Sequence, residues 1–312
     1  MPDTLRAKLI VFSPFVTNAM RRLARRGLAR AVRPPITAWP KRRAAVEAAV
    51  PPQQRDRGAA FLMALGGGGL AVVSAAAAYT YTTSSEPIDV DAHPRCGCCA
   101  RVERFDALAE TYDDEIGVDE LVMGLPLLRR WLLRRARGDV LEVACGTGRN
   151  LELYPAAVTS IVATDASDAM VRVTAAKAAT LGDGRISVRR AAVETVAGAY
   201  DTVVDTFGLC SVDDPVAALQ AMAGAVRPGG EVLLLEHGRA HYAWLNRLLD
   251  RHAAQHLLRW GCSWNRDYVR VIEQAGLEVV SLRRFHLGTT VLAVVRAPPP
   301  GGASCACGTC SK

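Results

Sequence analysis

Apolar and polar positions change their spacing repeatedly between residues 139 and 296. Short apolar runs, bounded by acids, glycine or proline, are separated by longer stretches whose apolar positions recur at helical spacing. An alternation of strands and helices requires a mostly parallel sheet with helices on both faces. The predicted strands cover residues 140–144, 160–165, 186–190, 202–206, 231–236, 278–282 and 290–295.

The last two predicted strands are joined by only a short connection. A parallel pair needs a crossover of a dozen or more residues, so we expect strands 278–282 and 290–295 to be antiparallel neighbours. The prediction is therefore an α/β fold with a seven-stranded, Rossmann-like sheet, mostly parallel with an antiparallel last strand, and with helices on both faces.

Residues 59–81 form one long apolar stretch, AAFLMALGGGGLAVVSAAAAYTY, inside the uncharged segment 58–85. A transmembrane helix needs about 20 such residues, and small residues are tolerated where helices touch. We therefore predict a single transmembrane helix before the sheet. An Ala/Gly-rich linker is the alternative, because four glycines and many alanines make the stretch only modestly hydrophobic.

Two further regions have helical spacing. Residues 101–137 place Phe105, Leu108, Ala109 and Tyr112 on one helix face, and residues 239–262 have the pattern of an amphipathic lid. The chain then divides into a basic targeting segment (1–45), a linker (46–58), the span (59–81), a cysteine-containing linker (82–100), one α/β domain (101–298) and a disordered, Cys-rich tail (299–312).

The net charge of +7 is concentrated near the N-terminus. Residues 1–58 contain thirteen Lys and Arg against three acids, a charge of +10, so the remaining chain carries −3. A nucleic-acid-binding domain needs a basic surface, so no nucleic-acid partner is expected. The basic, acid-poor residues 1–45 are typical of a mitochondrial targeting sequence, and a disordered basic tail is the alternative.

Charge also orients the predicted span. Basic residues precede residues 59–81 and acids follow them, and positive residues stay on the negative side of a bilayer. In the mitochondrial inner membrane the domain would then face the intermembrane space, where inner-membrane proteins are candidate partners. The endoplasmic reticulum membrane is the alternative location.

Nine cysteines offer candidate metal ligands. Cys145, Cys210 and Cys262 lie in the domain, and the others form clusters of three before and after it, Cys96, Cys98, Cys99 and Cys305, Cys307, Cys310. The outer clusters suit thiolate metal binding or disulfides, but their spacing is not that of a zinc ribbon. His252 and His256 have i, i+4 spacing without a partner motif. We predict no metal site, and unstructured or oxidisable thiols in the outer clusters.

One stretch carries candidate binding chemistry, DVLEVACGTGRNL at residues 139–151. A buried strand bearing Glu142 breaks into a glycine turn, where a ligand can approach the backbone N–H groups. A dinucleotide-binding motif, G-x-G-x-x-G or G-x-G-x-x-A, would have a small residue at the position that Leu151 occupies. Leucine there, and an acid before the turn, suit a cofactor without phosphates that carries an amino group and a sulfonium, as S-adenosylmethionine does. Asp165 ends the next strand and can accept hydrogen bonds from both ribose hydroxyls. NAD is the minor alternative.

Four motifs occur in order along the chain: LEVACGTGRN, ATDASDAM, YDTVVDTFGLCSVDDP and VRPGGEVLLLEHG. With them, residues 105–296 resemble a class I S-adenosylmethionine-dependent methyltransferase of the ubiquinone/menaquinone C-methyltransferase branch. LCSVDDP, EHG and the late WGCSWNRDY are more similar to membrane-anchored methyltransferase-like proteins, including alkyl-thiol S-methyltransferases and mitochondrial inner-membrane relatives. One departure is Ala144, where the family has glycine, and we expect a slightly shifted turn.

The resemblance implies a cofactor site along the ends of the first four strands. It places a helix bearing Tyr112 and Asp113 over the methionine end of the cofactor, and the residues after the third strand around the adenine. The predicted cofactor-binding residues are Tyr112, Glu142, Ala144, Cys145, Gly146, Thr147, Gly148, Asp165, Ala166, Met170, Ala192, Val193, Glu194, Thr206, Phe207, Gly208 and Cys210.

On the acceptor side, the resemblance implies that residues 239–262 select the substrate, with His241, Trp244 and Trp260 in the pocket wall. A methyl acceptor needs a base only if it must lose a proton, which a thiol or an acidic phenol does readily. His237, directly after the fifth strand, is the candidate general base, and a structural hydrogen-bonding role is its alternative.

The sequence therefore predicts a membrane-anchored S-adenosylmethionine-dependent methyltransferase for a small lipophilic acceptor, either a thiol or a quinone-type molecule. The alternative is a non-catalytic methyltransferase-like assembly or scaffold factor of the mitochondrial inner membrane. A protein or RNA methyltransferase is disfavoured, because TFGL follows the fourth strand where an Asn-Pro-Pro-Tyr-type motif would recognise an amide.

Overall fold

The computed structural model describes residues 97–298. The predicted segments 1–45, 46–58 and 59–81, most of the linker 82–100 and the tail 299–312 lie outside the described residues. Within residues 97–298, the helices are all too short or too polar to cross a membrane.

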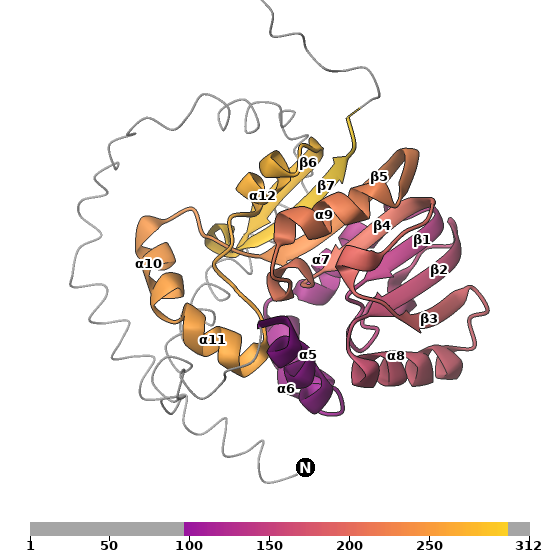
Figure 1. Ribbon diagram of the computed structural model, residues 1–312, viewed down its shortest axis with the longest axis horizontal. Coiled ribbons are helices and arrows are strands. Elements are labelled where there is room, and N and C mark those ends of the chain that lie inside the picture. The colour runs from indigo at the N-terminus through magenta and orange to yellow at the C-terminus, as the bar shows by residue number, and fades with distance from the viewer. Residues whose placement is uncertain (1–96, 299–312) are drawn as a thin grey trace, which may run out of the picture.

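A seven-stranded sheet of order β3-β2-β1-β4-β5-β7-β6 is the centre of the described region (Figure 1). Its strands are β1 (Gly138–Val143), β2 (Val158–Asp165), β3 (Ile186–Arg190), β4 (Tyr200–Thr206), β5 (Val226–His237), β6 (Glu278–Phe285) and β7 (Thr290–Arg296). Strands β1 to β5 pair in parallel, and β7 pairs antiparallel with both β5 and β6. The predicted antiparallel pairing of the last two strands is confirmed.

Strand β5 begins earlier than the predicted strand 231–236. Its pairing with β4 jumps from Tyr200↔Val226 to Thr202↔Glu231, so a bulge containing Pro228 lies inside the strand. A Cβ at Gly230 would lie 2.6 Å from the carbonyl oxygen of Asp201, so only glycine fits there. Residues 227–230, between these two pairs, therefore form a bulge, because the strand is paired with β4 on both sides of them.

Eight α-helices are described: α5 (Gly97–Leu108), α6 (Tyr112–Val122), α7 (Leu125–Leu133), α8 (Asp168–Leu181), α9 (Pro215–Gly224), α10 (Ala243–Arg251), α11 (Ala253–Trp260) and α12 (Tyr268–Gln274). Polar caps start three of them. The side chains of Ser167, Asp214 and Asp267 accept backbone N–H bonds at the starts of α8, α9 and α12. Short 3₁₀ turns include η2 (Leu151–Leu153), η3 (Val193–Thr195), η4 (Leu209–Ser211) and η5 (His286–Gly288).

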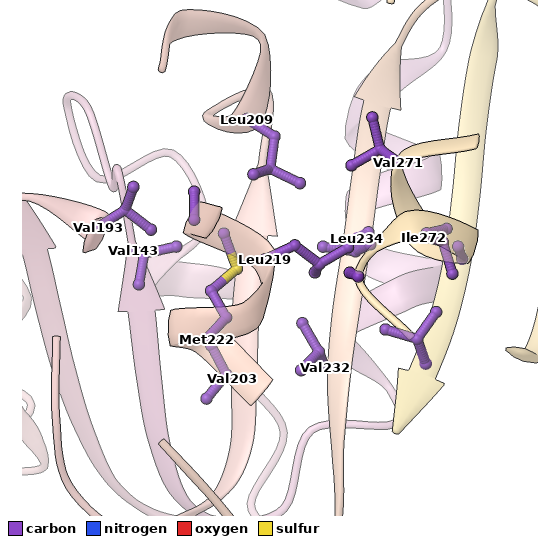
Figure 2. Close-up of a cluster of buried hydrophobic side chains, with 14 of the residues drawn as sticks. Val143, Val193, Val203, Leu209, Leu219, Met222, Val232, Leu234, Val271 and Ile272 are labelled. Atoms are coloured by element: carbon purple, nitrogen blue, oxygen red, sulfur yellow. The ribbon is translucent and has the colours of Figure 1, made fainter. Parts of the chain in front are cut away.

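Helices cover both faces of the sheet, as predicted. Figure 2 shows Leu219 and Met222 of α9 packed with Val203 of β4 and Val232 of β5 on one face, where α12 also contributes. Helix α7 packs Leu132 and its neighbours against the opposite face. Burying both faces of parallel strands explains why these strands are almost continuously apolar in sequence.

The lid, residues 239–262, contains α10 and α11 and lies beside α5 (Figure 1). Asn246 exchanges two hydrogen bonds with the backbone of Ala240 at the base of α10. Arg104 of α5 donates to the carbonyl oxygen of Arg259 in α11 at 2.7 Å. The backbone N–H of His241 also donates to the carbonyl oxygen of Leu287 in η5, between β6 and β7, so the lid is attached both to the sheet end and to the N-terminal helix.

Candidate active site

A pocket opens at the carboxyl ends of β1, β2 and β4, which is where parallel sheets bind their ligands. Of the seventeen predicted cofactor-binding residues, fourteen line it: Tyr112, Ala144, Cys145, Gly146, Thr147, Asp165, Ala166, Met170, Ala192, Val193, Glu194, Thr206, Phe207 and Gly208. Glu142, Gly148 and Cys210 are the three that do not.

Ten further lining residues were not predicted: Arg101, Val102, Phe105, Arg129, Arg149, Ser167, Ala191, Ser211, Val212 and Asp213. Phe105 could have been found, because it lies on the same predicted helix face as Tyr112. Arg129 could not, because it is one of two adjacent arginines in α7 and nothing in the sequence marks it as the buried one.

The two glycines of the turn have different structural reasons. Both Gly146 and Gly148 have positive φ, at 56° and 76°. Gly146 lines the pocket, and a Cβ on it would meet nothing within 4 Å. A Cβ on Gly148 would lie 2.9 Å from the side chain of Leu151. Gly146 therefore leaves pocket space for a ligand, and Gly148 allows the following segment to pack closely.

Ala144 keeps the positive φ that a glycine would adopt, at 47°. The substitution has left the backbone in the left-handed region, so the expected shift of the turn is replaced by strain at one residue. Phe207, at the end of β4, also has a positive φ of 60°. Strained residues of this kind collect at ligand sites because the surrounding structure holds them in place.

Asp165 is positioned by the backbone on both sides of the pocket floor. Its two carboxylate oxygens accept from the N–H groups of Gly146 and Ser167, each at 2.9 Å. Burial raises the pKa of Asp165, and these backbone hydrogen bonds oppose that effect. Each oxygen keeps a second lone pair, so the carboxylate can still accept from two ligand hydroxyls.

Glu142 lies beneath the pocket. Its carboxylate accepts from Asn150 at 2.9 Å and from the hydroxyl of Tyr154 at 2.7 Å, and burial raises its pKa to about 7. Asn150 also donates to Thr206, which lines the pocket. Glu142 therefore acts on the site through these neighbours, as a positioning residue.

A buried ionic network supports the entrance of the pocket. Arg129 donates to Glu120 at 2.8 Å and to the hydroxyl of Thr206 at 2.7 Å, which connects α6 and α7 to the end of β4. Arg149 bridges Glu120 and Asp113. The network holds α6 over the glycine turn.

Asp113 belongs to this network, although the resemblance placed it near the cofactor with Tyr112. It accepts from Thr147, Arg149 and Lys177 at 2.7 to 3.0 Å. These bonds hold the pKa of Asp113 below its usual value, against the opposing effect of partial burial. The carboxylate is therefore engaged in closing α6 onto the turn, and Tyr112 is the member of the pair that lines the pocket.

Two buried carboxyl groups meet behind the end of β4. Asp205 and Glu236 both accept from the backbone N–H of Leu209, at 3.2 and 2.9 Å. Burial raises the pKa of Asp205 to about 6, and burial with the neighbouring Asp205 raises that of Glu236 well above its usual range. One shared proton lets the pair hold the η4 turn without a net double charge.

The predicted acceptor-side residues lie outside the pocket lining. His237 contacts Phe207 edge to face, with ring centroids 5.5 Å apart, and its Nε2 lies 3.6 Å from the sulfur of Cys262. His241 packs against Gly288. Trp244 is 55% exposed, and Trp260 stacks under the guanidinium of Arg259. His237 therefore lies behind Phe207 and outside the pocket lining.

The residues present fit the methyl donor that the resemblance implies. Asp165 offers two acceptors to ribose hydroxyls, and the backbone at Gly146 leaves open space. Part of the remaining pocket lining is apolar. Val193 and Met170 provide that apolar surface for a flat base. The site therefore accommodates a nucleoside, with acceptors for its ribose and apolar surface for its base.

Comparisons with known proteins identify relatives. A family profile described as a methyltransferase domain matches residues 120–282. The chain is 39% identical over 204 residues to the mitochondrial methyltransferase OMS1 of Saccharomyces cerevisiae, covering 58% of this chain and 43% of that protein. It is 33% identical over 156 residues to human thiol S-methyltransferase TMT1A, covering 47% and 63%. The matches thus span less than two thirds of these two relatives.

Other matches span nearly whole proteins. The chain is 30% identical over 214 residues to the ubiquinone biosynthesis O-methyltransferase of Azotobacter vinelandii, covering 62% of this chain and 92% of that protein. Among solved structures, a DhpI–SAH complex is similar with a TM-score of 0.51 and 22% identity, covering 65% of this chain and 97% of the other. That structure shows the shared fold. Because the family profile covers just over half of the residues, the chain belongs to the methyltransferase-domain family, and its methyl donor is S-adenosylmethionine.

Proposed function

We propose that the protein transfers a methyl group from S-adenosylmethionine to a small lipophilic acceptor, a thiol or a quinone-type molecule, at a membrane surface. The observation that carries this proposal is the apolar wall between α5 and the end of β4, formed by Val102, Phe105, Phe207 and Val212. Such a wall suits an apolar acceptor, since buried apolar surface provides most of the affinity for small ligands. Relatives named for thiol and ubiquinone methylation support the same class.

When bound, S-adenosylmethionine supplies a reactive methyl group on a sulfonium, so the protein has to align the reactants and exclude water. Asp165 orients the ribose through its carboxylate, and Gly146 gives the ligand access to the backbone. Phe105 and Tyr112 cover the site from the N-terminal helices. A thiol acceptor loses its proton without a dedicated base, which agrees with the placement of His237 behind Phe207.

Membrane attachment is part of the proposal. It is supported by the apolar residues 59–81 and by an exposed apolar patch of Tyr242, Trp244 and Leu287 on the described domain. The backbone N–H of His241 donates to the carbonyl oxygen of Leu287, which brings the two parts of the patch together. Tyr and Trp are enriched where proteins meet membrane interfaces.

We place the protein in the mitochondrial inner membrane, with the domain in the intermembrane space. The basic residues 1–45 and the mitochondrial name of the yeast relative support this location. Protease added to mitoplasts with ruptured outer membranes should degrade the domain. Protection of the domain under these conditions would contradict the orientation.

The cofactor site is tested by calorimetric titration of S-adenosylmethionine into the full-length protein in detergent. We expect micromolar binding, on the order of −8 kcal/mol, and its loss in Asp165→Ala. Asp168→Ala is the matched control, because this exposed carboxylate at the start of α8 lies three residues from Asp165 and pairs with Arg190 outside the pocket lining. No binding in the folded wild-type protein would favour a scaffold role.

The acceptor class is tested with labelled S-adenosylmethionine and three sets of acceptors: alkyl thiols, demethylated quinols and water-soluble thiols of similar acidity. We expect methylation of the lipophilic acceptors and at least a tenfold lower kcat/KM for the water-soluble ones, because these leave the apolar wall uncovered. Equal rates for both kinds of thiol would show that the wall does not select the acceptor.

A further inference from the structure

Four side chains that can bind a transition metal converge beside the pocket: Cys210, His237, His256 and Cys262. The ligand atoms of Cys210, His237 and Cys262 all lie within 4.8 Å of one another. The Nε2 of His237 lies 3.6 Å from the sulfur of Cys262, and the Nε2 of His256 lies 3.1 Å from the same sulfur. Both cysteines are buried and free of disulfides.

The fold assembles this cluster from four separate parts of the chain. Cys210 lies in η4, His237 ends β5, His256 lies in α11 and Cys262 follows that helix. The backbone N–H of Ser263 donates to the carbonyl oxygen of Cys210 at 2.8 Å, which holds the two cysteine segments together. Sequence spacing could not indicate the cluster, because no two of its members form a short metal-binding motif.

Both imidazole rings are held by aromatic neighbours. His256 stacks on Trp264 with ring centroids 4.0 Å apart and an angle of 15°, and the indole N–H of Trp264 donates to Leu249 of α10. His237 meets the edge of Phe207. Aromatic packing therefore helps to orient the nitrogens that contact the sulfur of Cys262, as a preorganised binding site requires.

Two sulfur–nitrogen distances in the cluster are close to those of tetrahedral coordination. Zinc binds sulfur at about 2.3 Å and imidazole nitrogen at about 2.0 Å, so the ligand atoms of a tetrahedral site lie roughly 3.5 Å apart. The separation between His237 and Cys262 has this value, and the one between His256 and Cys262 is about 0.4 Å shorter. His256 is not among the three residues whose ligand atoms all lie within 4.8 Å of one another, so its ring has to move closer to Cys210 and His237 to become the fourth ligand.

We propose that Cys210, His237, His256 and Cys262 bind one zinc ion in a closed tetrahedral site. Two thiolates and two neutral imidazoles are soft and intermediate ligands, which favour zinc over magnesium or calcium. Binding releases the two thiol protons, and the two thiolates then balance the charge of Zn²⁺. A neutral complex suits this buried place, since an uncompensated charge there would be costly.

The zinc ion has a structural role at the edge of the active site. The sulfur of Cys210 lies 3.2 Å from the carbonyl oxygen of Phe207, and Gly261 packs against the ring of Phe105. Both phenylalanines line the apolar wall. By joining η4 and β5 to α11, the ion fixes the lid against the wall that receives the acceptor. This inference goes beyond the proposed function and does not depend on the acceptor.

The metal content of the purified full-length protein tests the proposal. Cys96, Cys98, Cys99, Cys305, Cys307 and Cys310 are first replaced by serine, so that the outer clusters bind nothing. In this background we expect about one zinc per chain by mass spectrometry of the metal. Cys262→Ser should lower the content at least tenfold, and Cys145→Ser, which changes the remaining buried cysteine, should leave it unchanged.

A titration with Co²⁺ tests the intact cluster directly and does not depend on whether Cys262→Ser folds. The chain with the intact cluster is freed of metal with a chelator and titrated with Co²⁺. We expect the thiolate charge-transfer band and the strong visible bands of tetrahedral cobalt at one ion per chain, with loss of both on adding zinc. Absence of zinc together with weak, octahedral cobalt bands would overturn the proposal. So would a Cys210–Cys262 disulfide in the freshly purified, unreduced protein.

Discussion

At the scale of single residues, Ala144 gives the sharpest test of the turn geometry. Its φ of 47° lies in the region that glycine adopts without cost, whereas alanine does not. Ala144→Gly removes this strain and adds flexibility to the unfolded chain, so we expect a net gain of roughly 0.5 kcal/mol in the free energy of unfolding. Urea denaturation of the full-length protein measures it.

The control is Ala175→Gly, at an exposed site in α8. Glycine in a helix interior is less favourable than alanine by about 1 kcal/mol, so the control should lose stability while Ala144→Gly gains it. Equal losses in both variants would mean that the turn around Ala144 relaxes in solution.

Glu142 gives a test by pH. Burial raises its pKa from the usual 4.5 to about 7 in the folded protein, so the folded state favours the protonated form. Stability contributed by this group is complete below pH 4.5 and is lost as the pH rises to about 7, by about 3 kcal/mol in all. In Glu142→Gln the free energy of unfolding should fall much less between pH 5 and 7.5.

Glu152→Gln is the matched control, because Glu152 is exposed in the neighbouring η2 turn. It should keep the wild-type slope. Part of the slope should remain in Glu142→Gln as well, since Asp205 has a pKa raised to about 6. A slope that is identical in all three proteins would refute the assignment to Glu142.

Residues whose role follows from their position on a strand could be predicted. Asp165 was found because an acid at the end of a parallel strand faces the ligand edge of the sheet. Arg129 was missed, because its pairing with Glu120 depends on how α6 and α7 turn toward β4. Glu142 is predicted to bind the cofactor but lies outside the pocket lining, and its contacts with Asn150 and Tyr154 depend on the path of the following turn.

At the scale of elements, the attachment of the lid can be tested at Asn246. Its side chain makes two hydrogen bonds with the backbone of Ala240, at 2.7 and 3.1 Å, and so fixes the start of α10. Asn246→Ala leaves that backbone without these partners, at a cost of about 1 to 3 kcal/mol. We expect faster amide hydrogen exchange in α10 and a higher KM for the acceptor, with unchanged affinity for S-adenosylmethionine.

Arg247→Ala is the control for Asn246→Ala, because Arg247 is exposed on the same helix. It should leave hydrogen exchange in α10 as in the wild type. Faster exchange across β1 and α8 in the Asn246 variant would instead indicate global destabilisation, and would remove the argument for a local role.

The elements themselves followed from periodicity, and their assembly followed only in part. The alternation of strands and helices determined a parallel sheet, and the short link between the last strands determined their antiparallel pairing. The bulge in β5 was not predicted, because Pro228 and Gly229 are strong local turn signals. Pairing of Val226 with Tyr200 extends the strand across them, and such a contact between distant residues leaves no local pattern.

At the scale of the whole molecule, the distribution of charge and apolar surface bears on the proposed membrane attachment. The basic excess lies in residues 1–58, while the rest of the chain carries −3. An acidic domain gains little from anionic lipid headgroups. Membrane binding by the domain alone would therefore depend on exposed apolar side chains, those of the patch of Tyr242, Trp244 and Leu287 and those of α6 and α7. Stable attachment would depend on residues 59–81.

The last prediction tests whether residues 59–81 provide the stable membrane attachment. The full chain, expressed in yeast cells, should remain in the membrane pellet after extraction with alkaline carbonate, because about 20 apolar residues suffice for a span. Deletion of residues 59–81 should release the protein into the supernatant. If residues 1–45 are a targeting segment, as we propose, their deletion should change the location of the protein in the cell but leave it in the pellet.

If the protein without residues 59–81 still stays in the membrane pellet, residues 59–81 are not what attaches it to the membrane. Trp244→Ser in the deleted chain then distinguishes the remaining causes. Release by this substitution would assign membrane binding to the exposed patch, where Trp244 stands beside Tyr242 with ring centroids 6.5 Å apart. Retention despite it would point to the exposed apolar side chains of α6 and α7, such as Leu121 and Leu127, or to a membrane protein partner.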